Sequence, residues 1–198
     1  MDPVTPAEVI DFWFGAPPLQ TRAEWFRKSD EFDNLVRRRF EPLVDASLAG
    51  MLPTEWHADA AGRLAQILVL DQFTRNIFRG SGRSFAGDGR ALALAQQMLA
   101  SREHTELHPL QRWFVYLPFE HAEDLAQQDT SVGLFTALAA EAPAGSDLAA
   151  SLADALDYAH RHRDVIARFG RFPHRNAALA RSSSAEEQAW LQQPGSGF

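Results

Sequence analysis

Cationic side chains gather near the end of the chain, in the segment RFGRFPHRN at residues 168–176. Six arginines and a single acid, Asp164, lie between residues 161 and 181, although the whole chain carries a net charge of −7. An arginine side chain binds a carboxylate or a phosphate through two parallel hydrogen bonds. This segment is therefore predicted to neutralise carboxylates of the fold or to receive an anion from outside it.

A second segment carries the opposite charge. Between residues 119 and 130 the chain has four carboxylates, on Glu120, Glu123, Asp124 and Asp129, and no lysine or arginine. Read alone, such a run is the solvated acidic face of a helix. Because four neighbouring carboxylates repel one another, we expect the arginine-rich segment to pack against them.

A third segment, LAQILVLDQFTRNIFRG, has the periodicity of a helix whose apolar face ends in charged groups. Asp71, Arg75 and Arg79 continue the face that begins with Leu64 and Leu68. Asp71 and Arg75 have the spacing of an (i, i+4) ion pair. In the purely structural interpretation this is a buried pair that fixes the register of the helix.

The three segments together predict a polar pocket, because clusters of perturbed ionisable groups are more frequent at functional sites than elsewhere. The surplus arginines would hold the anionic group of a ligand. His121, beside Glu120, is the best candidate for a general base, and His174 is the second candidate. The candidate ligand-binding residues are Asp71, Arg75, Asn76, Arg79, Glu120, His121, Asp124, His160, Arg168, Arg171, His174 and Arg175.

Several other chemistries are disfavoured by the sequence. The chain has no cysteine, no His-Glu-x-x-His motif, and one Asp-x-x-His spacing, Asp157 to His160, so no metal or other cofactor is expected. The glycine-rich stretch GSGRSFAGDG lacks Gly-Lys-Ser/Thr and is predicted to be a loop. The acidic composition disfavours nucleic acid as a partner. No apolar run reaches the ~20 residues needed to span a membrane, and the first residues do not resemble a signal peptide, so a cytoplasmic location is expected.

The elements that must position these residues are all predicted to be helices, in one domain covering residues 1–198. Thr5 and Ser29 are predicted N-caps, Gly50 and Gly170 predicted ends, and Ser183 or Ser184 the cap of a last helix. The segment at 59–80 is predicted to be one continuous helix. Short connections favour stacked antiparallel hairpins.

Three details of these helices are also predicted. Pro42 is expected to bend or divide the helix at 29–50, and Leu35 to lie on its apolar stripe. Pro118 is expected near the start of a new helix. Glu120, Glu123 and Asp124 would then share one face of that helix.

Three passages in this order, LDQFTRNIFRG, YLPFEHAEDLAQQ and RFGRFPHRNAALAR, resemble the bacterial family called domain of unknown function 924, as does the opening EVIDFWFG. The resemblance covers essentially the whole chain. It implies a tetratricopeptide-like right-handed superhelix of helical hairpins and leaves the activity open. The sequence departs from the family pattern at Thr74, where the family has proline, and at Ala180, where it has glycine, so the backbone shape at both positions is in question.

Three functions remain open from the sequence. The first is binding of a small anionic molecule or the end of an acidic peptide by the charged pocket. The second is a hydrolase-type enzyme that uses His121 or His174 with carboxylate partners. The third is a purely structural network in a protein whose function rests on contacts with other proteins. The sequence does not indicate an oligomeric state or the identity of a ligand.

Overall fold

The computed structural model describes residues 3–197, and all the regular structure in that range is helical, which confirms the all-α class. The helices are α1 (Pro6–Phe14), α2 (Asp30–Ala49), α3 (Ala60–Ile67), α4 (Thr74–Ile77), α5 (Asp88–Ser101), α6 (Pro109–Glu120), α7 (Leu125–Glu141), α8 (Asp147–Phe169) and α9 (Ala185–Leu191). Short helical turns lie between them at η1 (Ala23–Trp25), η2 (Thr54–His57), η3 (Leu68–Phe73), η4 (Gly82–Phe85), η5 (Glu103–Glu106) and η6 (Pro173–Arg175).

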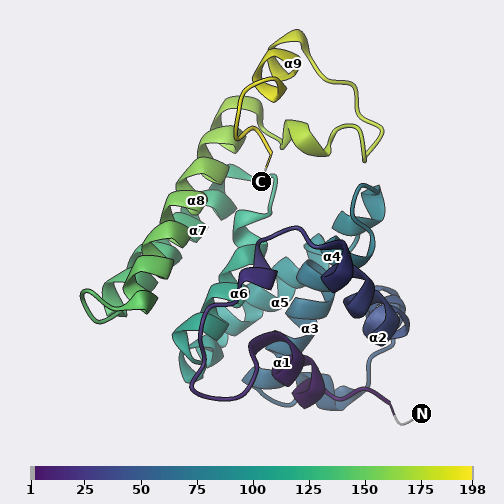
Figure 1. Cartoon of the computed structure of the whole chain (residues 1–198), viewed down its shortest axis with the longest axis vertical. Helices are drawn as coiled ribbons and strands as arrows, with labels where there is room; N and C mark the ends of the chain where they lie inside the picture. The colour runs from purple at the N-terminus through teal and green to yellow at the C-terminus, as the bar shows by residue number, and fades with distance from the viewer. Residues whose placement is uncertain (1–2, 198) are drawn as a thin grey trace.

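The helices form two connected parts (Figure 1). The part that holds α1 to α5 is the larger, and α6 joins it to a long antiparallel hairpin of α7 and α8. After α8 the chain runs through η6 to α9, and a short segment follows α9. Stacked helical hairpins are thus present in α6 to α8, whereas the tetratricopeptide-like superhelix stays a prediction.

The helix boundaries follow the capping residues in the sequence. Thr5 and Ser184 each form a complete capping box, and the Ser29 hydroxyl accepts from the Phe32 amide. Gly50 and Gly170 end α2 and α8 in the left-handed conformation, with φ of 73° and 68°. These predicted boundaries are confirmed.

Aromatic rings fill the centre of the larger part. Trp13 of α1 lies 5.6 Å from Phe73 of η3 and 5.6 Å from Phe114 of α6, measured between ring centroids. Phe40 of α2 lies 4.8 Å from Phe73. The segment of α3 and η3 runs through this core, so residues at its end are held rigidly by packing from several sides.

The expectation of one continuous helix at 59–80 was wrong in one respect. The α-helix gives way to a π-helix, η3, in which backbone hydrogen bonds are redirected. Side chains take up carbonyl groups at this point: the Thr74 hydroxyl donates to the Leu70 carbonyl at 2.7 Å, and Arg75 donates to the Asp71 carbonyl at 2.7 Å. The threonine that replaces the family's proline therefore has a specific contact in this chain.

The three detailed helix predictions also need correction. Pro42 lies inside α2 and does not divide it, so a bend at Pro42 stays a prediction. Pro118 lies inside α6 and does not begin a helix. Leu35 is 41% exposed and lies off the apolar stripe. Asp124 caps α7 by accepting from the Gln127 amide. A new helix therefore begins there, and the acids of this segment do not share one helical face.

Ala180 adopts the conformation that the family's glycine would favour, with φ of 53°. An alanine in this region costs about 1 kcal/mol because its Cβ crowds the backbone. Ala180 therefore adopts this turn conformation at a small cost in stability.

Among the described residues no helix is both long and apolar enough to cross a membrane.

Gly87 marks a close approach between the start of α5 and the π-helix. A Cβ atom at this position would lie 2.1 Å from the Leu70 carbonyl oxygen. We predict that Gly87→Ala lowers the free energy of unfolding by about 3 kcal/mol, because backbone must move to relieve the overlap. Gly89→Ala is the matched control, since nothing lies within 4 Å of a Cβ there. It should leave stability unchanged or raise it by up to about 1 kcal/mol. Urea unfolding measures both, and equal effects would contradict the prediction.

Candidate functional site

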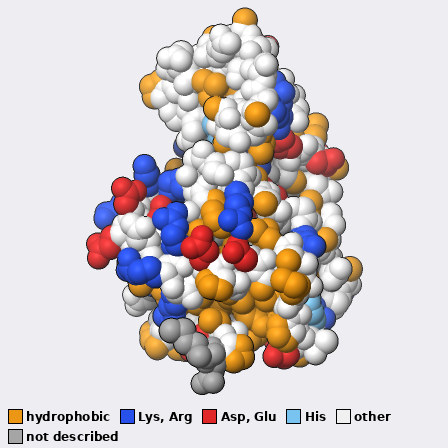
Figure 2. Space-filling model, turned by 90° about the vertical axis from the view of Figure 1, so that its right-hand side faces the viewer, with side chains coloured by type: hydrophobic (Ala, Val, Ile, Leu, Met, Phe, Trp, Pro, Cys, Tyr) orange, Lys and Arg blue, Asp and Glu red, His pale blue; other side chains and the backbone are white. Residues whose placement is uncertain are grey.

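A cavity of about 580 Å³ lies between the segment at residues 21–28, the end of η3 with α4, and the helices α6 and α8. Arginine and lysine side chains make up one part of its wall: Arg22, Arg27, Lys28, Arg75, Arg79 and Arg175. In the space-filling view, charged side chains of both signs gather on one flank of the molecule beside an area of hydrophobic side chains (Figure 2).

Aromatic side chains make up another part of the same wall. Phe26 stacks on Trp113 with ring centroids 5.0 Å apart, and Phe26 is 58% exposed. Trp25, Phe85 and Tyr158 complete this apolar lining. The cavity therefore presents both charge and apolar surface, as ligand sites for small molecules commonly do.

Asp71 lies at the base of the charged wall, fully buried in η3. Its Oδ1 atom is 2.7 Å from His121 Nδ1 and 3.2 Å from an Arg75 nitrogen, and its Oδ2 atom accepts from Gln72 at 2.6 Å. Burial raises the pKa of this carboxyl, but Arg75 and His121 outweigh it, and the pKa lies below its usual value. Asp71 is thus an anion, and the predicted pair with Arg75 is present.

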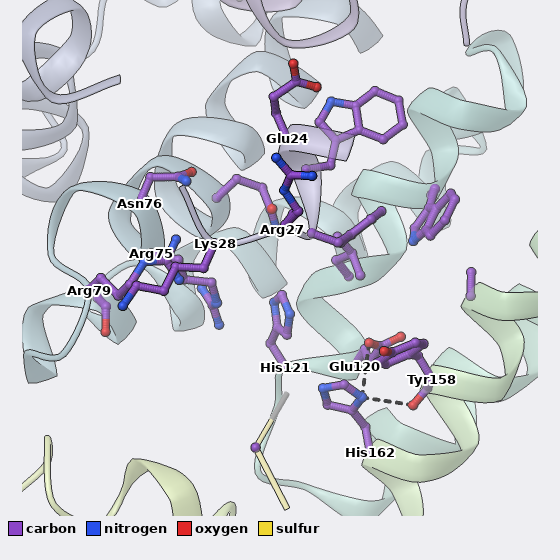
Figure 3. Close-up of a pocket in the computed structure, with 18 of the residues that line it drawn as sticks. Glu24, Arg27, Lys28, Arg75, Asn76, Arg79, Glu120, His121, Tyr158 and His162 are labelled. Atoms are coloured by element: carbon purple, nitrogen blue, oxygen red, sulfur yellow. Dashed lines mark hydrogen bonds and ion pairs between the residues drawn. The ribbon is translucent and has the colours of Figure 1, made fainter. Parts of the chain in front are cut away.

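His121 projects from the end of α6 toward the cavity (Figure 3). Burial and the neighbouring Arg75 lower its pKa, against the opposing effect of Asp71. The imidazole is therefore neutral near neutral pH. Its Nδ1 must carry the proton, because it faces an ionised carboxylate.

Two arginines share the carboxylate of Asp88, the first residue of α5. Arg75 binds it through two bonds of 2.8 and 3.0 Å, and Arg175 through one of 3.2 Å. The Arg175 guanidinium lies 4.6 Å from the ring centre of Phe85 and 4.4 Å from that of Phe172. Burial and Arg75 lower the pKa of Arg175 to about 10, so it stays cationic at neutral pH.

The Nε atom of Arg175 is buried and has no hydrogen-bond partner among the residues that the structure describes. An unpartnered donor of a buried guanidinium is costly. His174, its neighbour on the cavity wall, has a pKa lowered to about 4 by burial and by Arg175.

Asn76 and Arg79 contact the cavity but are bound to an acid of α2. Asp33 accepts from Asn76 at 2.7 Å and from Arg79 at 2.7 and 3.0 Å. Burial opposes ionisation of Asp33, but these bonds keep its pKa lowered. This pair thus ties α4 to α2 at the edge of the site.

Glu120 and His162 form a second carboxyl–histidine pair, with 3.2 Å between Glu120 Oε1 and His162 Nδ1 (Figure 3). The same nitrogen lies 2.9 Å from the Tyr158 carbonyl. Burial and the charge of Asp71 raise the pKa of Glu120 to about 8, and burial holds the pKa of His162 well below its usual value. Both groups are therefore uncharged at neutral pH.

Seven of the predicted site residues line the cavity, and Asp71 lies directly behind its wall. The seven are Arg75, Asn76, Arg79, Glu120, His121, His174 and Arg175. The segment that contains Asp71 and the acidic segment thus meet at the cavity as expected. The arginine-rich segment joins them there through His174 and Arg175 of η6.

The other four predicted residues lie outside the cavity wall. Asp124 caps α7, and His160 is exposed on α8. Arg168 and Arg171 bind Glu186 and Glu187, at 2.8 and 2.7 Å, and so hold α9 against the end of α8. Their carboxylate partners lie in the last helix of the chain, and the sequence analysis did not predict these two ion pairs.

The acidic and arginine-rich segments do pack together, and Glu120 takes part through His162 rather than through an arginine. Arg181 binds Glu123 with two bonds of 2.6 and 2.8 Å, and Arg163 lies 2.6 Å from Asp129. Arg161 pairs with Asp157 on its own helix. Most of the arginine-rich segment is thus used within the fold.

The sequence reasoning missed the contribution of residues 21–28. This segment, TRAEWFRK, mixes cations and aromatics as RFGRFPHRN does, and that mixture is the signal that could have identified it. It also missed His162, which lies on the inner face of α8, whereas His160 points outward.

The chain matches the family described as bacterial protein of unknown function (DUF924) over residues 9–195. It belongs to the DUF924 family. A solved structure of a protein of unknown function from Agrobacterium tumefaciens, ATU0120, has 36% sequence identity and a TM-score of 0.80, over 94% of this chain and 96% of the other. No curated protein matches.

Within residues 3–197 of this chain, no group of three or more histidine, aspartate and glutamate side chains could hold a metal ion.

The raised pKa of Glu120 predicts a pH-dependent stability difference. Folded protein keeps the Glu120 proton up to about pH 8, whereas the unfolded chain loses it near its ordinary value of 4.5. As the pH rises between these two values, the free energy of unfolding of the wild-type protein should therefore fall relative to that of Glu120→Gln, by about 1 kcal/mol per pH unit. Urea unfolding of both proteins from pH 5 to 8 measures the difference. Parallel stability curves would contradict it.

Proposed function

We propose that the cavity binds a small organic anion with an apolar or aromatic body. The observation that carries this proposal is the joint presence of a cationic wall and an aromatic wall around one cavity of about 580 Å³. Cavities of this size enclose a small molecule, and a few placed polar groups fix its orientation. The end of an acidic peptide offers the same carboxylate chemistry in a larger ligand.

The charge of the wall supports an anionic ligand. Arg27 and Lys28 have no carboxylate within ion-pair distance in the described part of the chain, and both are exposed at the cavity. Arg75 and Arg175 face two carboxylates, Asp71 and Asp88, so their charges are balanced within the fold. Arg27 and Lys28 supply the excess positive charge at the cavity. An incoming carboxylate or phosphate would meet donors that the fold does not already satisfy.

The aromatic wall supports an apolar body on the ligand. Phe26 and Tyr158 are 58% and 48% exposed, which leaves large apolar side chains beside the cationic groups. A ligand that covers them gains the free energy of burying apolar surface, about 25 cal/mol per Å². A bare inorganic anion would leave that surface in water.

The proposal predicts a charge-dependent stabilisation by ligands. Aryl carboxylates and aryl phosphates should raise the melting temperature, and their neutral amides should not, since a ligand that prefers the native form stabilises it. Arg27→Gln should weaken binding about tenfold, in the range expected for a lost hydrogen bond to a charged group. Arg38→Gln is the control, because it removes the same charge from an exposed position of α2 away from the cavity.

Thermal shift and isothermal titration calorimetry measure these effects, with short acidic peptides as a separate arm. Tighter binding of the peptides would assign the site to a peptide end. Equal stabilisation by anions and amides, or none by either, would overturn the proposal.

A hydrolase-type activity is a second candidate, favoured by the bond between His121 Nδ1 and Asp71. Neutral His121 would take a proton from water, whose hydroxyl adds to an ester carbonyl. Glu120, which is protonated, would give its proton to the departing alcohol, so the products are an acid and an alcohol.

This second candidate predicts hydrolysis of 4-nitrophenyl esters that carry an anionic acyl group. His121→Gln should lower kcat by about 100-fold or more, the usual contribution of a general base. Release of 4-nitrophenolate measures the rate. A rate equal to that in buffer, or one unchanged by His121→Gln, would exclude this activity on such esters.

A further inference from the structure

The hydrogen bonds around Asp71 fix the orientation and the proton of His121. Asp71 Oδ1 contacts His121 and Arg75, and Oδ2 accepts from Gln72. The Asp71 backbone carbonyl is also bound, by Arg75. Because the carboxylate is ionised and held on several sides, the imidazole ring is locked with its Nδ1–H toward Asp71.

The other ring nitrogen of His121 is left as an acceptor at the cavity. His121 Nε2 makes no hydrogen bond to any residue within 3–197, and the ring lies on the cavity wall (Figure 3). An unprotonated imidazole nitrogen can accept a hydrogen bond, whereas the guanidiniums around it can only donate. A ligand that covers it without offering a donor leaves it unpaired.

Cationic side chains that could bind an anion lie close to the His121 ring. His121 Nδ1 and an Arg75 nitrogen are 2.7 and 3.2 Å from the same Asp71 oxygen, so the two nitrogens are at most about 6 Å apart. Arg175 shares Asp88 with Arg75 and lines the same cavity. An anionic group bound by these arginines would therefore lie beside His121.

We infer that the site prefers an organic anion with a hydroxyl on the atom next to its charged group, as in 2-hydroxy carboxylates, whose hydroxyl donates to His121 Nε2 while its carboxylate contacts Arg75 and Arg175. This inference rests on the proposed function and names its ligand class. A 2-amino carboxylate also has a donor, but its ammonium group would lie beside the guanidiniums of Arg75 and Arg175, and the carboxylates of Asp71 and Asp88 that could offset this repulsion are already bound by those guanidiniums. A carboxylate without any donor would cover Nε2 and leave it unpaired. A site built to bind a hydroxyl rejects the analogue that lacks it.

The test compares three acids that share one aromatic body. 3-Phenyllactate has the hydroxyl, 3-phenylpropionate lacks it, and phenylalanine has an ammonium in its place. Isothermal titration calorimetry of the wild-type protein should show 3-phenyllactate binding at least tenfold more tightly than either of the others. His121→Phe, which keeps an aromatic ring and removes the acceptor, should bind 3-phenyllactate and 3-phenylpropionate equally.

A second measurement needs neither a variant nor a ligand. Nitrogen-15 NMR of the imidazole should show a protonated Nδ1 and an unprotonated Nε2 for His121 at pH 7. A protonated Nε2 would overturn the inference even if the variant failed to fold.

The outcomes separate the inference from the proposed function. Equal affinity of the wild-type protein for 3-phenyllactate and 3-phenylpropionate would overturn the hydroxyl preference and leave anion binding intact. If phenylalanine bound most tightly, the ligand class would be wrong. If none of the three bound, both proposals would fail for anions with an aryl body.

Discussion

The site depends on the burial of one ionised carboxylate, that of Asp71. A carboxylate removed from water is tolerated when it is paired and hydrogen-bonded. The π-helix turns Asp71 inward, and its oxygens then draw Arg75 and His121 to fixed positions. Arg75 in turn binds Asp88, which holds Arg175. A single buried charge thereby orders side chains from η3, α4, α5, α6 and η6.

The network has features that a purely structural role does not require. Buried ion pairs on average add little stability compared with apolar packing of the same volume. A network built only for stability would be closed, with every donor bound and no cavity beside it. Here a cavity of about 580 Å³ borders the network, and Arg175 Nε lacks a partner in the part of the chain that is described. These two observations favour a role for the charged groups beyond holding the fold.

Local signals in the sequence were sufficient for the helices and for part of the site. Capping residues such as Thr5 and Ser184 act within one turn of the chain, so they could be located without knowing the tertiary structure. The π-helix could not be predicted, because the apolar periodicity of this segment is that of an ordinary α-helix, and the close approach of Gly87 to Leu70 exists only in the folded chain. The ion-pair partners of the arginines could not be predicted from the sequence either. Arg171 binds Glu187 because the folded chain places α9 beside it, and no local pattern in the sequence indicates this position. The segment at 21–28 reaches the cavity only through tertiary packing.

The cavity wall is assembled from stretches spread over most of the chain, from Thr21 to Gly197. Neither half of the polypeptide contains a complete set of contacts for the proposed anion. A molecule bound in the cavity would therefore contact both the α7–α8 hairpin and the larger part of the protein, and it would restrict their movement relative to each other. The mechanical rigidity of the protein would then differ between the ligand-free and the ligand-bound states.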